Sequence, residues 1–190
     1  MILYVGIIVV ANVVLAVLGT LVTELPWWNV TLRVVLATVG VIALDGLTAW
    51  LVRLLPERYF SVPRQFGAGR REIRFYRRIG IRTWKEKVPE LGLFTKFSKS
   101  RVERPTDADY LARFILESNY GVMIHLVNAV VGFALCAVPV LYPVWLIALP
   151  VAVVNAVLSL LPMFILRYNL PKLAYLHVRS AKKAERVEIS

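Results

Sequence analysis

Titratable and amide side chains stand where an apolar run of the sequence begins, in the stretch ESNYGVMIHLVN from 117 to 128. On a continuous helix, Arg113, Glu117, His125 and Asn128 all fall within one stripe of about 120°. Lipid offers such groups no hydrogen-bond partner, so the stripe is expected to face neighbouring helices. An ionisable residue inside an apolar run is a candidate for function. The histidine side chain ordinarily titrates near neutral pH, which suits it to proton transfer.

Two other apolar runs carry polar groups that a rise of about 1.5 Å per residue places at a similar depth. Asp45 and Ser159 are expected to lie near the depth of His125, and Asn155 deeper. Such a set either contacts a ligand or joins neighbouring helices by hydrogen bonds. Both interpretations stay open for His125 and Asp45, whereas packing is the expected role of Asn155 and Ser159.

The elements that would position these groups are four apolar runs, 2–22, 30–52, 121–141 and 144–166. Each has the roughly 20 residues that a helix needs to cross a bilayer. The first run lacks the basic residues that precede a cleaved signal peptide, so we expect it to be a span. The predicted fold is all-α: a polytopic membrane protein with four transmembrane helices plus interfacial amphipathic helices.

The basic residues are divided unevenly between the expected loops. Of 23 Lys and Arg, 16 lie from Arg53 to Arg113 and six from Arg167 onward, while Arg33 stands alone. Because cytoplasmic loops carry the excess of Lys and Arg, both termini are predicted to be cytoplasmic, in a multi-pass protein of the cell membrane. This distribution accounts for the positive charge without nucleic acid, for which the sequence has no motif.

Four segments follow from this division. Residues 1–53 hold the first two spans, 54–118 a basic cytoplasmic or interfacial segment, 119–166 a helical hairpin of two spans, and 167–190 a basic tail. Within the second segment, Ile73, Tyr76, Trp84 and Val88 share one helical face among many cations. That face is expected in the headgroup region, with the cations toward anionic lipid. Gly80 is a possible break in this helix.

The next helix is expected to begin at Thr106 as N-cap. It then either continues through Glu117 into the third span or breaks near 119–121.

Three stretches resemble the glycosyl-4,4'-diaponeurosporenoate acyltransferase family: EIRFYRRIGIRTWKEKVPE, YLARFILESNYGVMIH and LPMFILRYNLPKL. These are small integral membrane proteins linked to acylation of a glycosylated carotenoid. The resemblance covers roughly residues 53 to 173. The matching positions are Glu72, Tyr76, Trp84, Lys85, Pro89, Glu90, Arg113, Phe114, Glu117, His125, Arg167, Tyr168 and Asn169.

The resemblance implies a membrane acyltransferase that moves an acyl group to a hydroxyl of a lipid-linked sugar or similar amphiphile. His125 would be the general base, with Glu117 and Asp45 as catalytic partners. The expected binding residues are Arg113, Asn128, Arg167, Tyr168, Asn169, Trp84, Lys85 and Tyr76. Among them Asn128, Tyr168 or Arg167 would stabilise the oxyanion. No metal and no cofactor are expected, although an acyl thioester would be a suitable donor, its phosphates held by the basic segment.

The alternative is a non-enzymatic four-helix membrane protein that binds anionic lipid or a partner through its basic cytoplasmic face. In that case topology would explain the charge, and packing would explain much of the polarity. For an enzyme, the expected partners are a lipid substrate entering from the inner leaflet and anionic membrane lipids, with no nucleic acid.

Overall fold

The structure, a computed structural model, describes residues 2–88, 102–143 and 145–188. It is 79% helical, and no strand occurs among the described residues. This confirms the predicted all-α class. Pro89 and Glu90 of the first family-like stretch lie outside the described residues.

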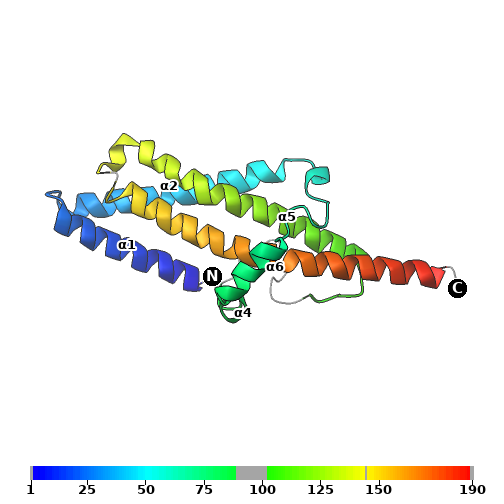
Figure 1. Ribbon diagram of the computed structural model, residues 1–190. Helices are drawn as coiled ribbons and strands as arrows, with labels where there is room; N and C mark the ends of the chain where they lie inside the picture. Colours follow the sequence, from blue (N-terminus) through cyan, green and yellow to red (C-terminus); the bar gives the residue numbers. More distant parts are fainter. Residues whose placement is uncertain (1, 89–101, 144, 189–190) are drawn as a thin grey trace. The chain divides into compact units, whose positions relative to one another are not determined.

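Four helices are long and apolar enough to cross a membrane, as predicted. They are α1 (Ile2–Val22), α2 (Trp27–Arg53), α5 (Ala108–Val131) and α6 (Ala148–Glu188) (Figure 1). Their most apolar windows have mean hydropathies between 1.8 and 2.7. The chain is therefore a multi-pass membrane protein by the length and composition of its helices.

Of the two alternatives for the helix before the third span, the continuous one is present, because α5 runs without a break from Ala108 through Gly121. Its N-cap is Asp107 rather than Thr106. The Asp107 carboxylate accepts a hydrogen bond of 2.9 Å from the Tyr110 backbone N–H, which satisfies one donor of the first turn. After Val131 the chain tightens into two short 3-10 segments, η3 (Gly132–Ala137) and η4 (Pro139–Leu141).

The helix that holds the fourth span, α6, also includes most of the residues assigned to the basic tail. α6 continues past Pro162 and Pro171 to Glu188. A proline inside a helix removes the N–H that would bond the carbonyl four residues earlier. Pro171 thereby frees the Arg167 carbonyl, which instead accepts a hydrogen bond of 2.9 Å from the Ala68 N–H. An outside donor thus satisfies the backbone group that the proline leaves without its usual partner.

The described chain divides into two compact units. Unit 1 comprises Met1–Val52 and Ile124–Leu160, and unit 2 comprises Arg53–Met123 and Leu161–Ser190. α5 and α6 each contribute to both units.

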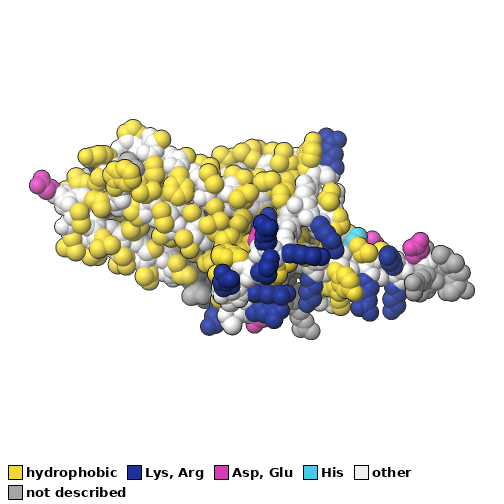
Figure 2. Space-filling model, in the orientation of Figure 1, with side chains coloured by type: hydrophobic (Ala, Val, Ile, Leu, Met, Phe, Trp, Pro, Cys, Tyr) yellow, Lys and Arg dark blue, Asp and Glu magenta, His cyan; other side chains and the backbone are white. Residues whose placement is uncertain are grey.

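In unit 1, α1 and α2 lie side by side as an antiparallel pair (Figure 1). They approach closely at Gly19, where an added Cβ would lie 2.7 Å from a Val30 methyl group. The Thr38 hydroxyl also donates to the Asn12 amide oxygen at 3.0 Å. The unit has a core of aliphatic residues from α2, η3, η4 and the start of α6, among them Val34, Val41, Leu135 and Val151. Figure 2 shows apolar side chains over the visible face of this unit, as lipid contact requires.

Unit 2 contains η1 (Glu57–Tyr59), α3 (Arg70–Arg78) and α4 (Ile81–Trp84), together with the parts of α5 and α6 that belong to it. Gly80 separates α3 from α4. Its φ of 69° lies in the left-handed region that glycine adopts without strain. The break predicted at this position is therefore present. Figure 2 shows Lys and Arg side chains gathered over α3, α4 and the C-terminal part of α6.

The apolar stripe of this segment packs against protein rather than facing headgroups. Tyr76 and Ile81 are 2% and 0% exposed, and they form a core with Ile165 of α6. Ile73, Trp84 and Val88 pack around the same core. The expected contact of this face with lipid is thus replaced by contact with α6, because the stripe finds an apolar partner within its own unit.

Candidate functional site

A bidentate ion pair joins α3 to α6 within unit 2. The Arg167 guanidinium donates from Nε and Nη2 to the two oxygens of Glu72, at 2.6 and 2.7 Å. The Tyr76 hydroxyl donates to the same carboxylate. The side chains of Arg167 and Glu72 are only 26% and 28% exposed. Bidentate pairing of this kind fixes orientation as well as adding energy.

The surroundings set the protonation of this cluster. The hydrogen bonds from Arg167 lower the pKa of Glu72 below its usual value, against the opposing effect of partial burial. Burial, together with the Glu72 carboxylate, raises the pKa of Tyr76. Glu72 therefore stays ionised and Tyr76 stays neutral at physiological pH. The fork of Arg167, predicted to clamp a substrate, is occupied by a carboxylate of the protein itself.

Two neighbouring residues expected to bind substrate also have internal partners. The Trp84 indole N–H donates to the Ile79 carbonyl at 3.0 Å, which closes the turn around Gly80. The Tyr168 hydroxyl accepts a hydrogen bond from Arg82 Nε at 3.2 Å. Tyr76, Trp84 and Tyr168 thus form the aromatic packing of α3 and α4 on α6.

Glu117 is the centre of a charged cluster at the surface of unit 2. Its carboxylate contacts Arg53 at 3.0 Å and Arg113 at 3.1 Å, and Arg113 also reaches Glu57 at 3.5 Å. The Glu117 side chain is 9% exposed, while those of both arginines are about half exposed. Because α5 does not break at Gly121, the bend that would carry Glu117 back toward His125 does not exist.

The two residues after Ser118 were not among the predicted site residues, yet they fix the chain that follows α2. The buried Asn119 amide donates to the carbonyls of Phe60 and Val62, at 2.6 and 3.1 Å. The Tyr120 hydroxyl donates to the Leu55 carbonyl at 2.8 Å, and its ring stacks on Phe60 with centroids 4.1 Å apart. The only sequence signal was an asparagine in mid-helix, a residue that favours side chain to backbone bonds.

In unit 1, a second polar cluster joins three spans. The Asn155 amide of α6 donates to the Asp45 carboxylate of α2 at 3.3 Å and to the Asn128 backbone carbonyl of α5 at 3.1 Å. Gly132 makes room for this amide, since a Cβ there would lie 3.0 Å from Asn155 Nδ2. Asn155, expected to lie deeper, is therefore the residue that connects Asp45 to Asn128.

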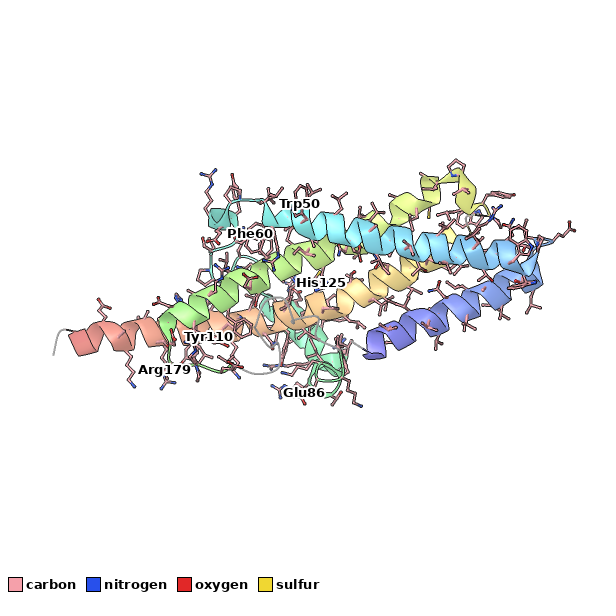
Figure 3. The ribbon with its side chains drawn as sticks, turned by 180° about the vertical axis from the view of Figure 1, so that it is seen from behind. Trp50, Phe60, Glu86, Tyr110, His125 and Arg179 are labelled. Carbon is pink, nitrogen blue, oxygen red and sulfur yellow. The ribbon has the colours of Figure 1, made fainter. Side chains whose placement is uncertain are left out.

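His125 stands on α5, one turn before Asn128 (Figure 3). It is half-buried, and Ser159 of α6 is buried. The Asn128 side-chain oxygen is buried and has no hydrogen-bond partner in the described structure. An amide oxygen without a partner is an acceptor available to a ligand hydroxyl or to water.

Pockets occur in both units. In unit 1 a cavity of about 60 Å³ is lined by Asn12, Thr38 and Asn155 among aliphatic residues. An apolar groove of about 470 Å³ runs between α1 and α2. In unit 2 a pocket of about 70 Å³ is lined by Lys85 and Asn169, both predicted to bind. His125 lines none of these three.

The model of the glycosyl-4,4'-diaponeurosporenoate acyltransferase family matches residues 56–179. This range includes all of the unit 2 contacts described above except those of Arg53 and Leu55, and it includes His125, Asn128 and Asn155 of unit 1. No curated protein and no solved structure gives a match.

Proposed function

Because the chain belongs to the glycosyl-4,4'-diaponeurosporenoate acyltransferase family, we propose that it transfers an acyl group to a hydroxyl of a lipid-linked sugar or similar amphiphile. The match over residues 56–179 is the observation that carries this proposal. The spans are consistent with a lipid acceptor, because an amphiphile held in the bilayer reaches a membrane-embedded site without leaving lipid.

The acyl donor of the proposed reaction is a thioester. A base removes the proton of the acceptor hydroxyl while the hydroxyl oxygen attacks the thioester carbonyl. The tetrahedral intermediate collapses, the carbon–sulfur bond breaks, and the thiolate leaves and takes up the proton. The products are an ester and a free thiol. Such a step needs a base, donors for the oxyanion and exclusion of water.

His125 is the proposed base. It is the one histidine in the apolar part of α5, it is half-buried, and it lies inside the family match. The hydrogen-bonded side chains of Asp45 and Asn155 and the buried amide oxygen of Asn128 supply polar groups within the same unit. We assign Asp45 and Asn128 to orientation of the reacting groups, and Glu117 with Arg113 to the charged surface of unit 2.

An assay with purified protein in lipid vesicles tests the function. Vesicles containing a glycosylated lipid are supplied with a long-chain acyl thioester, and the acylated product is measured by mass spectrometry alongside the free thiol. We expect ester and thiol to appear in equal amounts. Absence of ester from a range of glycosylated lipids and thioesters, with the protein intact, would argue for the non-enzymatic alternative.

We also propose that both termini and the basic residues of unit 2 are cytoplasmic in the cell membrane. The uneven division of Lys and Arg supports this orientation. Cys136 is the single cysteine, so a Cys136→Ala background allows single cysteines to be placed at exposed positions. We expect Glu24→Cys to react with an impermeant thiol reagent in intact cells, and Glu86→Cys to react only after permeabilisation. The reverse labelling pattern would show that both termini and the basic residues lie on the outer side of the membrane.

A further inference from the structure

The pocket of unit 2 that contains Lys85 and Asn169 combines cations with an apolar wall. Its lining comprises Lys85, Lys172, Asn169 and Ser118, with Phe114, Leu166, Leu173 and Val102. Its volume is about 70 Å³. A single water needs about 10–15 Å³ by a similar measure, so the pocket suits a compact polar group rather than an acyl chain.

Among the described residues, the lining of this pocket does not balance its charge. Lys85 and Lys172 both line it, and none of the described lining residues is acidic. No ion pair of either lysine occurs among the described residues. Ser118 is only 3% exposed, and apolar side chains form the rest of the wall. Lys85 is half-buried and Lys172 is exposed, so the apolar wall strengthens the attraction for an anion mainly at Lys85.

The three family-like stretches of the sequence meet at this pocket. Lys85 follows α4, Phe114 and Ser118 lie one turn apart on α5, and Asn169 lies on α6. Arg167 is two residues before Asn169, about 200° away around the helix. The pairing of Arg167 with Glu72 therefore fixes the rotation of α6 that turns Asn169 and Lys172 toward the pocket.

We propose that this pocket binds a phosphate group of the acyl donor, a thioester whose carrier bears phosphates. The proposal deepens the acyltransferase function proposed above and rests on it for the identity of the donor. Two ammonium groups, an amide and a hydroxyl over an apolar wall match a phosphate joined to a less polar chain. A phospholipid headgroup offers the same phosphate chemistry, so the experiment must distinguish these two sources.

Binding of coenzyme A, of phosphopantetheine and its unphosphorylated form pantetheine, and of a short-chain phosphatidylglycerol is measured by calorimetry on the full chain in zwitterionic nanodiscs. We expect phosphopantetheine to bind at least about tenfold more tightly than pantetheine, as charge-assisted hydrogen bonds to phosphate require. The Lys85→Gln/Lys172→Gln variant should lose about tenfold or more in coenzyme A affinity for the same reason.

The matched control is Lys182→Gln/Lys183→Gln, which removes two exposed lysines of α6 that line a different surface hollow. It should bind coenzyme A like the wild type. Equal losses in both double variants, or no loss in the first, would overturn the pocket as the site. If only phosphatidylglycerol binding depended on Lys85 and Lys172, the donor assignment would be wrong. Because binding is measured without turnover, these outcomes are independent of whether acyl transfer is detected.

Discussion

Replacing Glu72 with alanine is expected to destabilise the protein by about 2 kcal/mol. The substitution leaves the guanidinium of Arg167 without its two carboxylate acceptors and leaves the Tyr76 hydroxyl without its own. Breaking a fully buried ion pair costs more, and breaking a surface pair costs less. The side chains of this pair are 28% and 26% exposed, which places it between the two cases.

Thermal unfolding followed by circular dichroism in detergent measures this effect. The expected loss corresponds to a fall in Tm of roughly 4–8 °C for a chain of this size. Glu86→Ala is the matched control, because Glu86 is an exposed acid just after α4 in the same unit, and its Tm should stay near that of the wild type (Figure 3). A Tm for Glu72→Ala equal to that of the control would show that the pair is not structurally important.

The pH dependence of stability gives a second readout for the same pair. Arg167 holds the pKa of Glu72 below its usual value, so folding favours the ionised carboxylate. The resulting stabilisation is fully present at neutral pH and is lost as the pH falls through the lowered pKa of Glu72. The Tm difference between the wild type and Glu72→Gln is therefore expected to shrink below about pH 4.5. A difference that grew on acidification would contradict this assignment.

The number and order of the spans could be predicted from the sequence, because a span is recognised by the length and apolar content of its residues. The four apolar runs correspond to α1, α2, α5 and α6. Gly80 also marked its break in advance, since the local backbone there needs a positive φ. The residue at which α6 ends could not be predicted from the sequence. Pro171 predicts a stop only when no outside group can take the carbonyl it frees, and the Ala68 N–H that does so is about 100 residues away in the chain.

The partners of the site residues were hidden for a similar reason. Arg167 was identified as a cation at the end of a span, but nothing local to it shows that Glu72 occupies its fork. Asp45 and Asn128 were placed at similar depth by the helical rise. Asn155 was expected to pack, but the residues that it joins were not predicted, because a depth estimate counts residues along each helix and ignores how the helices pack. The partners in such tertiary hydrogen bonds can be identified only once the packing of the helices is known.

The family-like stretches contain both packing residues and pocket-lining residues, and a single sequence cannot separate these two roles. Tyr76, Trp84 and Tyr168 share a packed cluster with α6, whereas Lys85 and Asn169 line a pocket. Both groups stand in the same short stretches. The first group explains how α3 and α4 are held on α6, and the second supplies groups that a ligand can contact. The contrast directs mutagenesis toward Lys85 and Lys172 for binding and toward His125 for chemistry.

Replacing His125 with alanine is expected to lower kcat by about 10²–10⁴-fold, the usual contribution of a positioned general base. The fold should persist, because α5 continues for several turns on either side and alanine favours helix. The measurement is the rate of ester formation in vesicles, with circular dichroism and Tm recorded for each variant. His125→Gln, which keeps polar atoms but does not titrate near neutral pH, should be as impaired as His125→Ala.

The second histidine of the chain provides the matched control. His177 lies on α6 in unit 2, and His177→Ala removes an imidazole from the same protein without touching unit 1. It should retain most of the wild-type rate. A packing role for His125 makes a different prediction: His125→Gln would recover activity, and His125→Ala would lower Tm along with the rate. Full activity in either His125 variant would assign the proton transfer to another group and leave His125 to the packing of α5.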